Sequence, residues 1–537
     1  MIVMALALLL GGLASFALEG LLRPRVAAPW RRPTAALLVH LGSWCLLHAA
    51  FLAVLQRPWF ASAFILSLQL VVIQTSLTKW RSLKEPFLYQ DFDYFLDAVR
   101  HPRLYLPFFG LWLATGAMLA GAVAIAAFLW LEPWLFTRLT PGEGLLALVL
   151  EGLVGAALLM AGLRRLPPVT LVPTQDLSPL GLYAFLWSYG RQARRPLDSR
   201  LSPPEFRQPA TAPDPEALPD VVVVQSESFF DPRRWSDHVH PDMLSHWDRL
   251  STGSLAHGPL RVPAWGANTV RTEAAFLTGL GPGELGNHRF NPYHQLARQP
   301  MPNLLASARR LGYRTVALHP WPASFYLRDR VLPALGIDHF LDISDFDPAD
   351  RDGQYIGDAA LARRVGSLLD DRDNAPLFLF VITMENHGPL HLETPGEADA
   401  RRLSPACQAA AHQAHYRDLQ VYLRHLANAD RMLDDLSRRL AESPRDGLLC
   451  WYGDHVPILD QAYQRLGEPD GMTDYLIWST RHDTALGPPP VEREVSRLAV
   501  ELLGWIHAHA ERNALAPAGV HHFEKNATPS RHTQEQE

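Results

Sequence analysis

Lysine and cysteine are both scarce in this chain of 537 residues. Only three of its 49 basic residues are lysines, which indicates a GC-rich coding sequence and says little about the fold. The three cysteines, Cys45, Cys407 and Cys450, are too few for a disulfide framework and lack the spacing of a zinc site. The 44 prolines and 35 glycines are too few for a fibrous or disordered protein. We therefore expect a globular protein of two or three domains.

Charge is divided unevenly along the chain. Residues 1–165 carry 13 basic and 8 acidic side chains, whereas the remaining residues carry 36 and 47. The mean hydropathy of −0.04 is typical of a soluble enzyme, but here it averages a basic apolar part and an acidic polar part. A phosphate backbone needs a basic protein surface. The acidic part therefore argues against a nucleic-acid partner.

Five stretches predict transmembrane helices. Three contain no charged side chain, and the other two contain one glutamate each. Each is long enough to cross about 30 Å of hydrocarbon. The first stretch lacks a basic n-region and a clear cleavage site, so we interpret it as an anchor and not as a removed signal peptide. The five stretches are residues 1–22, 33–56, 58–78, 104–131 and 144–163.

The two glutamates in these stretches differ in position. Glu151 lies near the middle of the fifth stretch, where a charge costs at least a few kcal/mol. It is either a functional carboxylate or a protonated or helix-paired group with a packing role. Glu19 lies near the end of the first stretch, and we expect it to snorkel to the membrane surface.

The loop charges make a prediction about topology. Basic residues gather in the loops 23–32 and 79–103 and at Arg164 and Arg165. By the positive-inside rule these loops are cytoplasmic, which leaves the large C-terminal part in the cytoplasm as well.

Composition also predicts the domain boundaries. Eleven prolines between residues 167 and 219 indicate a stiff connection, and within it residues 177–195 (LSPLGLYAFLWSYGRQARR) are typical of an interfacial helix. The alternative is a short helix packed on the soluble domain. We expect a transmembrane domain at 1–165, a Pro-rich linker with this helix at 166–218, a catalytic α/β domain at 219–510 and a disordered tail at 511–537.

Short apolar runs in the C-terminal part indicate buried strands. They alternate with amphipathic helical stretches such as 301–311 and 419–440, a pattern typical of an α/β domain with a mostly parallel sheet. The runs are residues 221–225, 313–319, 376–384 and 448–454.

Three ionisable residues follow two of these strands. Glu227 comes after the first strand, and Asp454 and His455 come after the last. Ligands bind beyond the carboxyl ends of strands in such sheets, and carboxylate and imidazole ligands suit Mn, Zn or Mg. Singly, an Asp-His pair is more often a turn than a metal site. The shared position at strand ends favours one divalent ion.

Thr269 stands before a helical run at 270–280. A hydroxyl at that place faces backbone N–H groups and the positive end of the helix, which stabilise an alkoxide and an attacked phosphate. The alternative is an ordinary helix cap, with Glu273 completing a capping box.

Five motifs in order resemble the lipoteichoic acid synthase and phosphoglycerol transferase branch of the alkaline phosphatase/sulfatase superfamily. Five spans before the catalytic domain also resemble that family. The motifs are Glu227 in QSESFF, Thr269 in NTVRTE, HPWPASFYLRDRVLPALG at 319–336, TMENHGPL at 383–390 and YGDH at 452–455.

The resemblance implies a sulfatase-like fold and one divalent metal, most often Mn²⁺, with Mg²⁺ or Zn²⁺ as alternatives. Its ligands would be Glu227, Thr269, Asp454 and His455, and Thr269 would be the catalytic nucleophile. The positions that hold the phosphoglycerol group correspond to His387, Arg328 and Tyr326.

Some positions depart from the family pattern or lie outside it. Trp321 stands where polymerising synthases have an acidic residue, and Tyr326 stands where they have tryptophan. These two departures leave open which substrate group the site recognises. Arg271 is either a phosphate contact or a surface ion pair with Glu273 or Asp248. The CxPxR-type sequence that arylsulfatases need is absent. The segment 78–95 resembles a loop that docks the catalytic domain.

The resemblance implies a phosphotransferase that moves glycerol phosphate from phosphatidylglycerol to a glycan or polyglycerol phosphate acceptor. It also implies a multi-pass protein of the bacterial inner membrane, with its catalytic domain facing the periplasm or outside, against the positive-inside prediction. The alternatives are a phosphoethanolamine transferase or phosphodiester hydrolase on the same fold, and a non-catalytic scaffold or transporter. The sequence makes no prediction of an oligomeric state.

Overall fold

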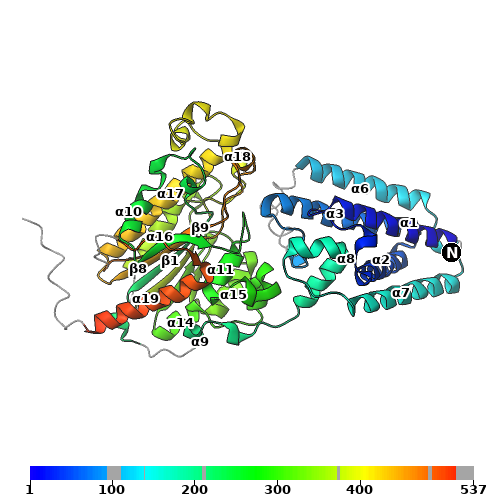
Figure 1. Cartoon of the computed structure of the whole chain (residues 1–537), viewed down its shortest axis with the longest axis horizontal. Helices are drawn as coiled ribbons and strands as arrows, with labels where there is room; N and C mark the ends of the chain where they lie inside the picture. The colour runs from blue at the N-terminus through cyan, green and yellow to red at the C-terminus, as the bar shows by residue number, and fades with distance from the viewer. Residues whose placement is uncertain (94–110, 138, 208–212, 372–374, 482–486, 516–537) are drawn as a thin grey trace, which may run out of the picture.

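The computed structural model describes residues 1–93, 111–137, 139–207, 213–371, 375–481 and 487–515. It consists of an N-terminal helical bundle and a larger C-terminal α/β domain (Figure 1). This arrangement confirms the predicted fold class, an all-α transmembrane bundle followed by an α/β domain.

Among the described residues, five helices of the bundle are long and apolar enough to cross a membrane. Because their number is odd, the N-terminus and the α/β domain lie at opposite ends of the bundle (Figure 1). Part of the predicted fourth span, residues 104–110, lies outside the described residues. The helices are α1 (Ile2–Leu18), α2 (Thr34–Leu55), α3 (Pro58–Leu83), α6 (Leu111–Leu131) and α7 (Pro141–Leu163).

Helices α2 and α7 pack closely although α3 and α6 separate them in the chain. A Cβ on Gly42 would lie 2.4 Å from the backbone nitrogen of Leu159, and one on Gly162 would lie 2.8 Å from the carbonyl oxygen of Ala35. Small residues let two membrane helices approach to backbone contact. These glycines therefore set the distance between α2 and α7.

The buried Glu151 of α7 is paired with a histidine of α2. A hydrogen bond of 2.7 Å joins its Oε1 to Nδ1 of His48, and both side chains are buried. Of the two interpretations of Glu151, the helix-paired carboxylate agrees with this contact.

Glu19 does not snorkel, contrary to the prediction. Its side chain is fully buried, because its carboxylate pairs with Arg32 and accepts a hydrogen bond of 2.7 Å from the backbone nitrogen of Leu182. Glu19 directly follows α1, Arg32 lies in the loop before α2, and Leu182 belongs to α8 (Pro173–Gln192). The hydrogen bond from Leu182 thus fastens α8 to the bundle.

Helix α8 lies on the side of the bundle that faces the α/β domain (Figure 1). Trp187 donates a hydrogen bond of 3.0 Å to the Ser43 hydroxyl of α2, and the ring of Tyr189 packs 5.8 Å from that of Phe290 in the α/β domain. The predicted helix in the Pro-rich connection is therefore present, and it contacts both parts of the molecule.

The α/β domain is built on an eight-stranded sheet in the order β10-β2-β9-β8-β1-β7-β3-β4. The pairs β8–β1, β1–β7, β7–β3 and β3–β4 are parallel, and β9 is antiparallel to both of its neighbours. The strands are β1 (Asp220–Ser226), β2 (Ala256–Arg261), β3 (Arg314–Leu318), β4 (His339–Leu341), β7 (Leu377–Ile382), β8 (Gly447–Gly453), β9 (Thr473–Ser479) and β10 (Arg493–Glu494); β5 (Arg351–Asp352) and β6 (Tyr355–Ile356) pair separately.

Helices cover both faces of the sheet (Figure 1). Alternate residues of β1 enter two different apolar cores, Val221 and Val223 on one face and Val222 and Val224 on the other. A strand buried on both faces reads as a continuous apolar run. The first core includes α11 (Thr269–Thr278), α13 (Pro292–Leu296), α14 (Leu304–Leu311), α15 (Arg328–Leu335) and α19 (Val495–Leu515); the second includes α10 (Ser245–Thr252), α16 (Asp358–Asp370), α17 (Ala414–Glu442) and α18 (Asp460–Leu466); short helices are α9 (Pro204–Arg207) and α12 (Pro282–Leu285).

The predicted tail begins inside a helix. Helix α19 continues to Leu515, so residues 511–515 are helical and not disordered. Its apolar face, which includes Leu502 and Ile506, packs into the first core and carries the helix past the expected boundary. Residues 516–537 lie outside the described part of the chain.

Enlarging a glycine between α2 and α7 should destabilise the bundle. We expect Gly42→Leu to lower the free energy of unfolding by about 1–3 kcal/mol or more, because the added atoms would overlap the α7 backbone. The measurement is the apparent Tm of the full chain in detergent. Gly121→Leu in α6 is the control, since nothing lies within 4 Å of its Cβ position. Equal Tm values for the two variants would contradict the close packing.

Candidate metal centre and active site

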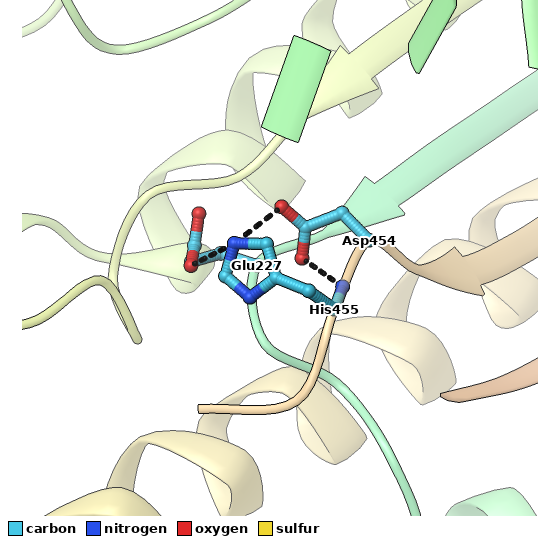
Figure 2. Close-up of side chains that lie close together, drawn as sticks. All are labelled: Glu227, Asp454 and His455. Carbon is cyan, nitrogen blue, oxygen red and sulfur yellow. Dashed lines mark hydrogen bonds and ion pairs between the residues drawn. The ribbon is translucent and has the colours of Figure 1, made fainter. Parts of the chain in front are cut away.

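Three ionisable side chains meet at the carboxyl ends of two neighbouring strands. β1 and β8 run parallel with Ser226 opposite Gly453, so Glu227 and Asp454 follow at the same edge of the sheet. Figure 2 shows the carboxylates of Glu227 and Asp454 and the ring of His455 turned toward one another. Their ligand atoms lie within 4.8 Å of one another, a grouping that can hold a metal ion.

A glycine allows the chain to reach this point. A Cβ on Gly453 would lie 1.8 Å from the carbonyl oxygen of Phe229, so no side chain fits before Asp454. Backbone groups then orient the carboxylate, because Asp454 Oδ1 accepts hydrogen bonds from the backbone nitrogens of Ser228 (2.8 Å) and His455 (2.9 Å). The second oxygen, Oδ2, is left for another partner.

The charges and unpaired atoms of Glu227, Asp454 and His455 favour a bound cation. His455 Nδ1 donates to the carbonyl of Val456 (3.1 Å), which leaves the lone pair of Nε2 facing Asp454 Oδ2 at 3.2 Å and Glu227 Oε1 at 3.6 Å. Among the described residues, neither Asp454 Oδ2 nor His455 Nε2 has a hydrogen-bond partner, although both are buried. Burial and the charge of Asp454 raise the pKa of Glu227 to about 8. The donor set and its unpaired atoms therefore fit a divalent ion.

Thr269 is the first residue of α11, and its side chain is buried. The Thr272 hydroxyl, on the same side of that helix, donates a hydrogen bond of 2.7 Å to the carbonyl of Asp454. The first turn of α11 thus lies against the loop that carries Asp454 and His455.

The capping alternative for Thr269 is wrong. The N-cap position belongs to Asn268, which makes no side-chain capping bond. Glu273 is not part of a capping box either, because its buried carboxylate accepts hydrogen bonds from Arg328 (3.2 and 2.8 Å) and from the Tyr293 hydroxyl.

Arg328 belongs to this buried network below α11. Besides Glu273 it donates a hydrogen bond of 3.1 Å to Nε2 of His319, whose Nδ1 donates to the carbonyl of Ile382 (3.2 Å). The guanidinium carbon lies 5.5 Å from the ring centre of Tyr326. Sequence reasoning missed His319, Glu273 and Tyr293 here. In the sequence, the one indication of this contact is that His319 is the first residue of the motif that also contains Arg328.

Trp321 and His387 flank a third aromatic ring. Tyr355 packs edge to face against Trp321 (5.8 Å between centroids) and against His387 (5.5 Å), and its hydroxyl donates to the carbonyl of Gly388 (3.0 Å). Burial lowers the pKa of His387, and the charge of Asp454 opposes that shift. Within the described part of the chain the buried Trp321 Nε1 has no hydrogen-bond partner.

Arg271 lies outside this constellation. Its guanidinium forms a two-pronged ion pair with Glu85 (3.0 and 2.9 Å), and neither Glu273 nor Asp248 is its partner. Although burial raises the pKa of Glu85, Arg271 and Lys79 lower it to about 2. The predicted ion pair with Glu273 or Asp248 was therefore wrong, because the partner lies 186 residues earlier in the chain, and the phosphate contact stays a prediction.

The segment after α3 docks on the α/β domain, as the resemblance implied. Besides the Glu85–Arg271 pair, Lys84 pairs with Glu468 at 2.5 Å, and the Gln90 amide donates to the carbonyl of Asn287 at 3.2 Å. Residues 94 and 95 of the predicted segment lie outside the described residues.

A second group of potential ligands consists of Asp352, Glu385 and His425. His425 hydrogen-bonds through Nδ1 to Glu385 (2.7 Å) and through Nε2 to Glu393 (3.1 Å). Although burial lowers the pKa of His425, these two carboxylates raise it to about 9. Both ring nitrogens face carboxylates, an arrangement that favours the imidazolium form. The ring clamps the loop that carries His387 onto α17.

Comparison with known proteins places these features in context. The sequence model of the family described as Sulfatase matches residues 219–507, more than half of the chain. The capsular polysaccharide biosynthesis protein RkpI of Rhizobium meliloti is 26% identical over 493 residues, which cover 88% of this chain and 86% of that protein. A putative cyclic beta-1,2-glucan modification protein of the same organism is 28% identical over 256 residues, which cover 48% of this chain and 38% of that protein.

One solved structure is similar over nearly the whole chain. It is the lipooligosaccharide phosphoethanolamine transferase A (EptA) of Neisseria meningitidis, an integral membrane protein. Its TM-score is 0.54 at 14% identity, and the alignment covers 94% of this chain and 95% of that chain. The likeness shows that a helical bundle and an α/β domain occur together in the same arrangement.

The His425 clamp should make stability depend on pH. The folded pKa of about 9 exceeds the unfolded value of about 6.5, so the clamp stabilises fully below pH 6.5 and loses its effect as pH rises through 9. We expect His425→Gln to cost about 3 kcal/mol at pH 6 and almost nothing at pH 10. The measurement is the difference in apparent Tm from wild type at each pH.

His339→Gln is the matched control, because that histidine is exposed on β4. A difference between His425→Gln and wild type that stays constant from pH 6 to pH 10 would contradict a charged clamp.

Proposed function

Because the chain belongs to the sulfatase family, we propose that it is a membrane-anchored, metal-dependent phosphoglycerol transferase. The observation that carries this proposal is the group of Glu227, Asp454 and His455, with its unpaired buried atoms, against the helix that Thr269 opens. Family membership alone does not choose the reaction, since one fold hosts several. The absence of a CxPxR-type sequence argues against sulfate ester hydrolysis.

Thr269 would act as the nucleophile in two displacements. Its hydroxyl oxygen attacks the phosphorus of phosphatidylglycerol, the bond from phosphorus to the diacylglycerol oxygen breaks, and diacylglycerol leaves with a proton. A hydroxyl of the acceptor then attacks the glycerophosphoryl threonine. The bond to Thr269 breaks, and the threonine regains its proton.

The ion would be held by Glu227, Thr269, Asp454 and His455. We propose Mn²⁺, with Mg²⁺ or Zn²⁺ as alternatives. When bound, a divalent ion lowers the pKa of the threonine hydroxyl and offsets charge on the phosphoryl oxygens. Backbone hydrogen bonds already orient the Asp454 carboxylate and the His455 imidazole, and the Ser228 hydroxyl donates a hydrogen bond of 2.9 Å to Glu227 Oε1, so little reorganisation accompanies binding.

The phosphoglycerol group would lie between Arg328, Tyr326, His387 and Trp321. The described contacts use three of the five N–H groups of Arg328, which leaves two for phosphate oxygens. The unpaired Nε1 of Trp321 is a donor for a glycerol hydroxyl. A glycerol hydroxyl that accepts this N–H would give the buried donor a hydrogen-bond partner.

The proposed acceptor is an extracytoplasmic glycan or polyglycerol phosphate. The relatives named for capsular polysaccharide biosynthesis and for glucan modification support a glycan. The proposed location is the bacterial inner membrane, with the catalytic domain on the periplasmic or outer side, where such acceptors occur. A phosphoethanolamine transferase is the second candidate, favoured by the fold similarity to EptA over nearly the whole chain.

Exposure to phosphatidylglycerol and Mn²⁺ should leave a covalent adduct on Thr269. We expect intact-mass analysis of the purified full chain to show one glycerophosphoryl group, and peptide mapping to place it on Thr269. Thr269→Ala should lose the adduct and release diacylglycerol at least about a hundredfold more slowly.

Thr269→Ser keeps the hydroxyl and should keep the adduct. An adduct formed from phosphatidylethanolamine and not from phosphatidylglycerol would support the second candidate. Unchanged diacylglycerol release in Thr269→Ala would exclude the proposed nucleophile.

A reporter at the C-terminus should report an exported domain. With five spans and the N-terminus in the cytoplasm, we expect alkaline phosphatase fused after Glu537 to be active and green fluorescent protein to be dark. Fusions after residue 56, between α2 and α3, should give the reverse result. A fluorescent C-terminal fusion would place the α/β domain in the cytoplasm.

A further inference from the structure

Four exposed arginines gather where α7 ends and α2 begins. The Cβ position of Gly162 lies 2.8 Å from the carbonyl of Ala35, which brings the last turn of α7 against the first turn of α2. Arg191 of α8 joins them by donating a hydrogen bond of 2.6 Å to the carbonyl of Leu163. We call this group the basic corner; its members are Arg31, Arg164, Arg165 and Arg191.

Three other cations at this end of the bundle are paired within the chain. Arg32 pairs with Glu19, Lys79 pairs with Glu85 and Asp91, and Lys84 pairs with Glu468. No carboxylate of the described residues forms an ion pair with any of the four arginines of the basic corner. Their charge is therefore available to a ligand from outside the chain.

The basic corner lies at the depth of lipid head groups. Arg164 and Arg165 directly follow the apolar helix α7, and Arg31 stands three residues before α2. Tryptophans mark the same level, as in the aromatic belts of membrane proteins. Trp30 is 82% exposed beside Arg31, and Trp187 of α8 is 38% exposed.

The position of the basic corner is also unfavourable for export of the catalytic domain. Arginines next to a span favour the cytoplasmic side, so keeping four of them at the other side works against the proposed topology. Exposed charges contribute little to the stability of a fold even when they are paired, and these four arginines have no ion-pair partner among the described residues. A binding role accounts for both observations.

We propose that the basic corner binds the phosphate groups of anionic phospholipids in the leaflet next to the catalytic domain. Each guanidinium offers paired N–H groups to phosphodiester oxygens, and the exposed tryptophans lie among the head groups. Binding here raises the local concentration of anionic lipid beside α8. That helix contacts the catalytic domain directly, through a hydrogen bond of 3.0 Å from the Asn287 amide to the carbonyl of Tyr189.

The role of this surface in donor supply rests on the proposed function, whereas lipid binding itself does not. Under the proposed function the basic corner collects phosphatidylglycerol, the anionic donor, from a membrane that also contains zwitterionic lipid. A zwitterionic donor such as phosphatidylethanolamine would gain little from it.

The first test is a binding measurement on the full chain with Thr269→Ala, purified in neutral detergent. The probe is a fluorescent short-chain phosphatidylglycerol, with the phosphatidylcholine analogue for comparison. We expect Arg164→Gln/Arg165→Gln to weaken phosphatidylglycerol binding about tenfold or more and to leave phosphatidylcholine binding unchanged. Arg164→Lys/Arg165→Lys keeps the charge and should retain most of the affinity.

Arg497→Gln/Arg512→Gln is the matched control, because it removes two exposed arginines from α19. Its affinity for phosphatidylglycerol should stay within about twofold of the parent. An equal loss in this control, or an unchanged affinity in Arg164→Gln/Arg165→Gln, would overturn the proposal. The apparent Tm of each variant must equal that of the parent, so that a lost affinity is not a lost fold.

The second test separates the basic corner from the proposed reaction. With Thr269 intact, Arg164→Gln/Arg165→Gln should lower kcat/KM for phosphatidylglycerol in mixed vesicles and leave turnover of a soluble glycerophosphoryl ester unchanged. No turnover of phosphatidylglycerol by wild type would refute the proposed function while the binding result stands. Normal turnover by both proteins in mixed vesicles, with unequal binding, would refute donor collection.

Discussion

The placement of Thr269 depends on the buried ion pair between Glu273 and Arg328. Glu273 lies one turn beyond Thr269 in α11, and Arg328 begins α15 and also holds His319 at the end of β3. Both charges are almost fully buried, so removing either partner would cost about 3–5 kcal/mol. The pair thus joins α11, which carries the proposed nucleophile, to the sheet and to the proposed phosphate contact.

The same helix also connects the catalytic domain to the bundle. Arg271 is only two residues from Thr269, and its pair with Glu85 reaches the segment that leaves α3. Within one turn of α11, Arg271 therefore faces the segment after α3 and Glu273 faces the interior of the α/β domain. One of the contacts that orient the candidate active site relative to the bundle therefore lies two residues from Thr269, beside those made by Lys84 and by α8.

Local patterns predicted the fold class, whereas distant pairings were out of reach. Apolar runs identified β1, β3, β7 and β8, and strand ends brought Glu227 and Asp454 together; their roles as ligands stay predictions. The strand β2 was missed because glycine and proline interrupt its pattern. The partners of Arg271 and Glu273 could not be predicted from the sequence. A charged residue near the start of a helix has the same local sequence pattern whether it caps that helix or pairs with a residue far away in the chain.

The contact between α2 and α7 has a consequence for biogenesis. His48 enters the bilayer with the second span, but its partner Glu151 arrives only with the fifth. Between these events the histidine has no carboxylate from α7, and Gly42 has no helix to pack against. The buried contact between His48 and Glu151 can therefore form only after α7 has been synthesised, when α2 also gains its glycine-lined contact with that helix. Because α7 precedes the α/β domain in the chain, the partners of the α2 residues are all present before that domain is synthesised.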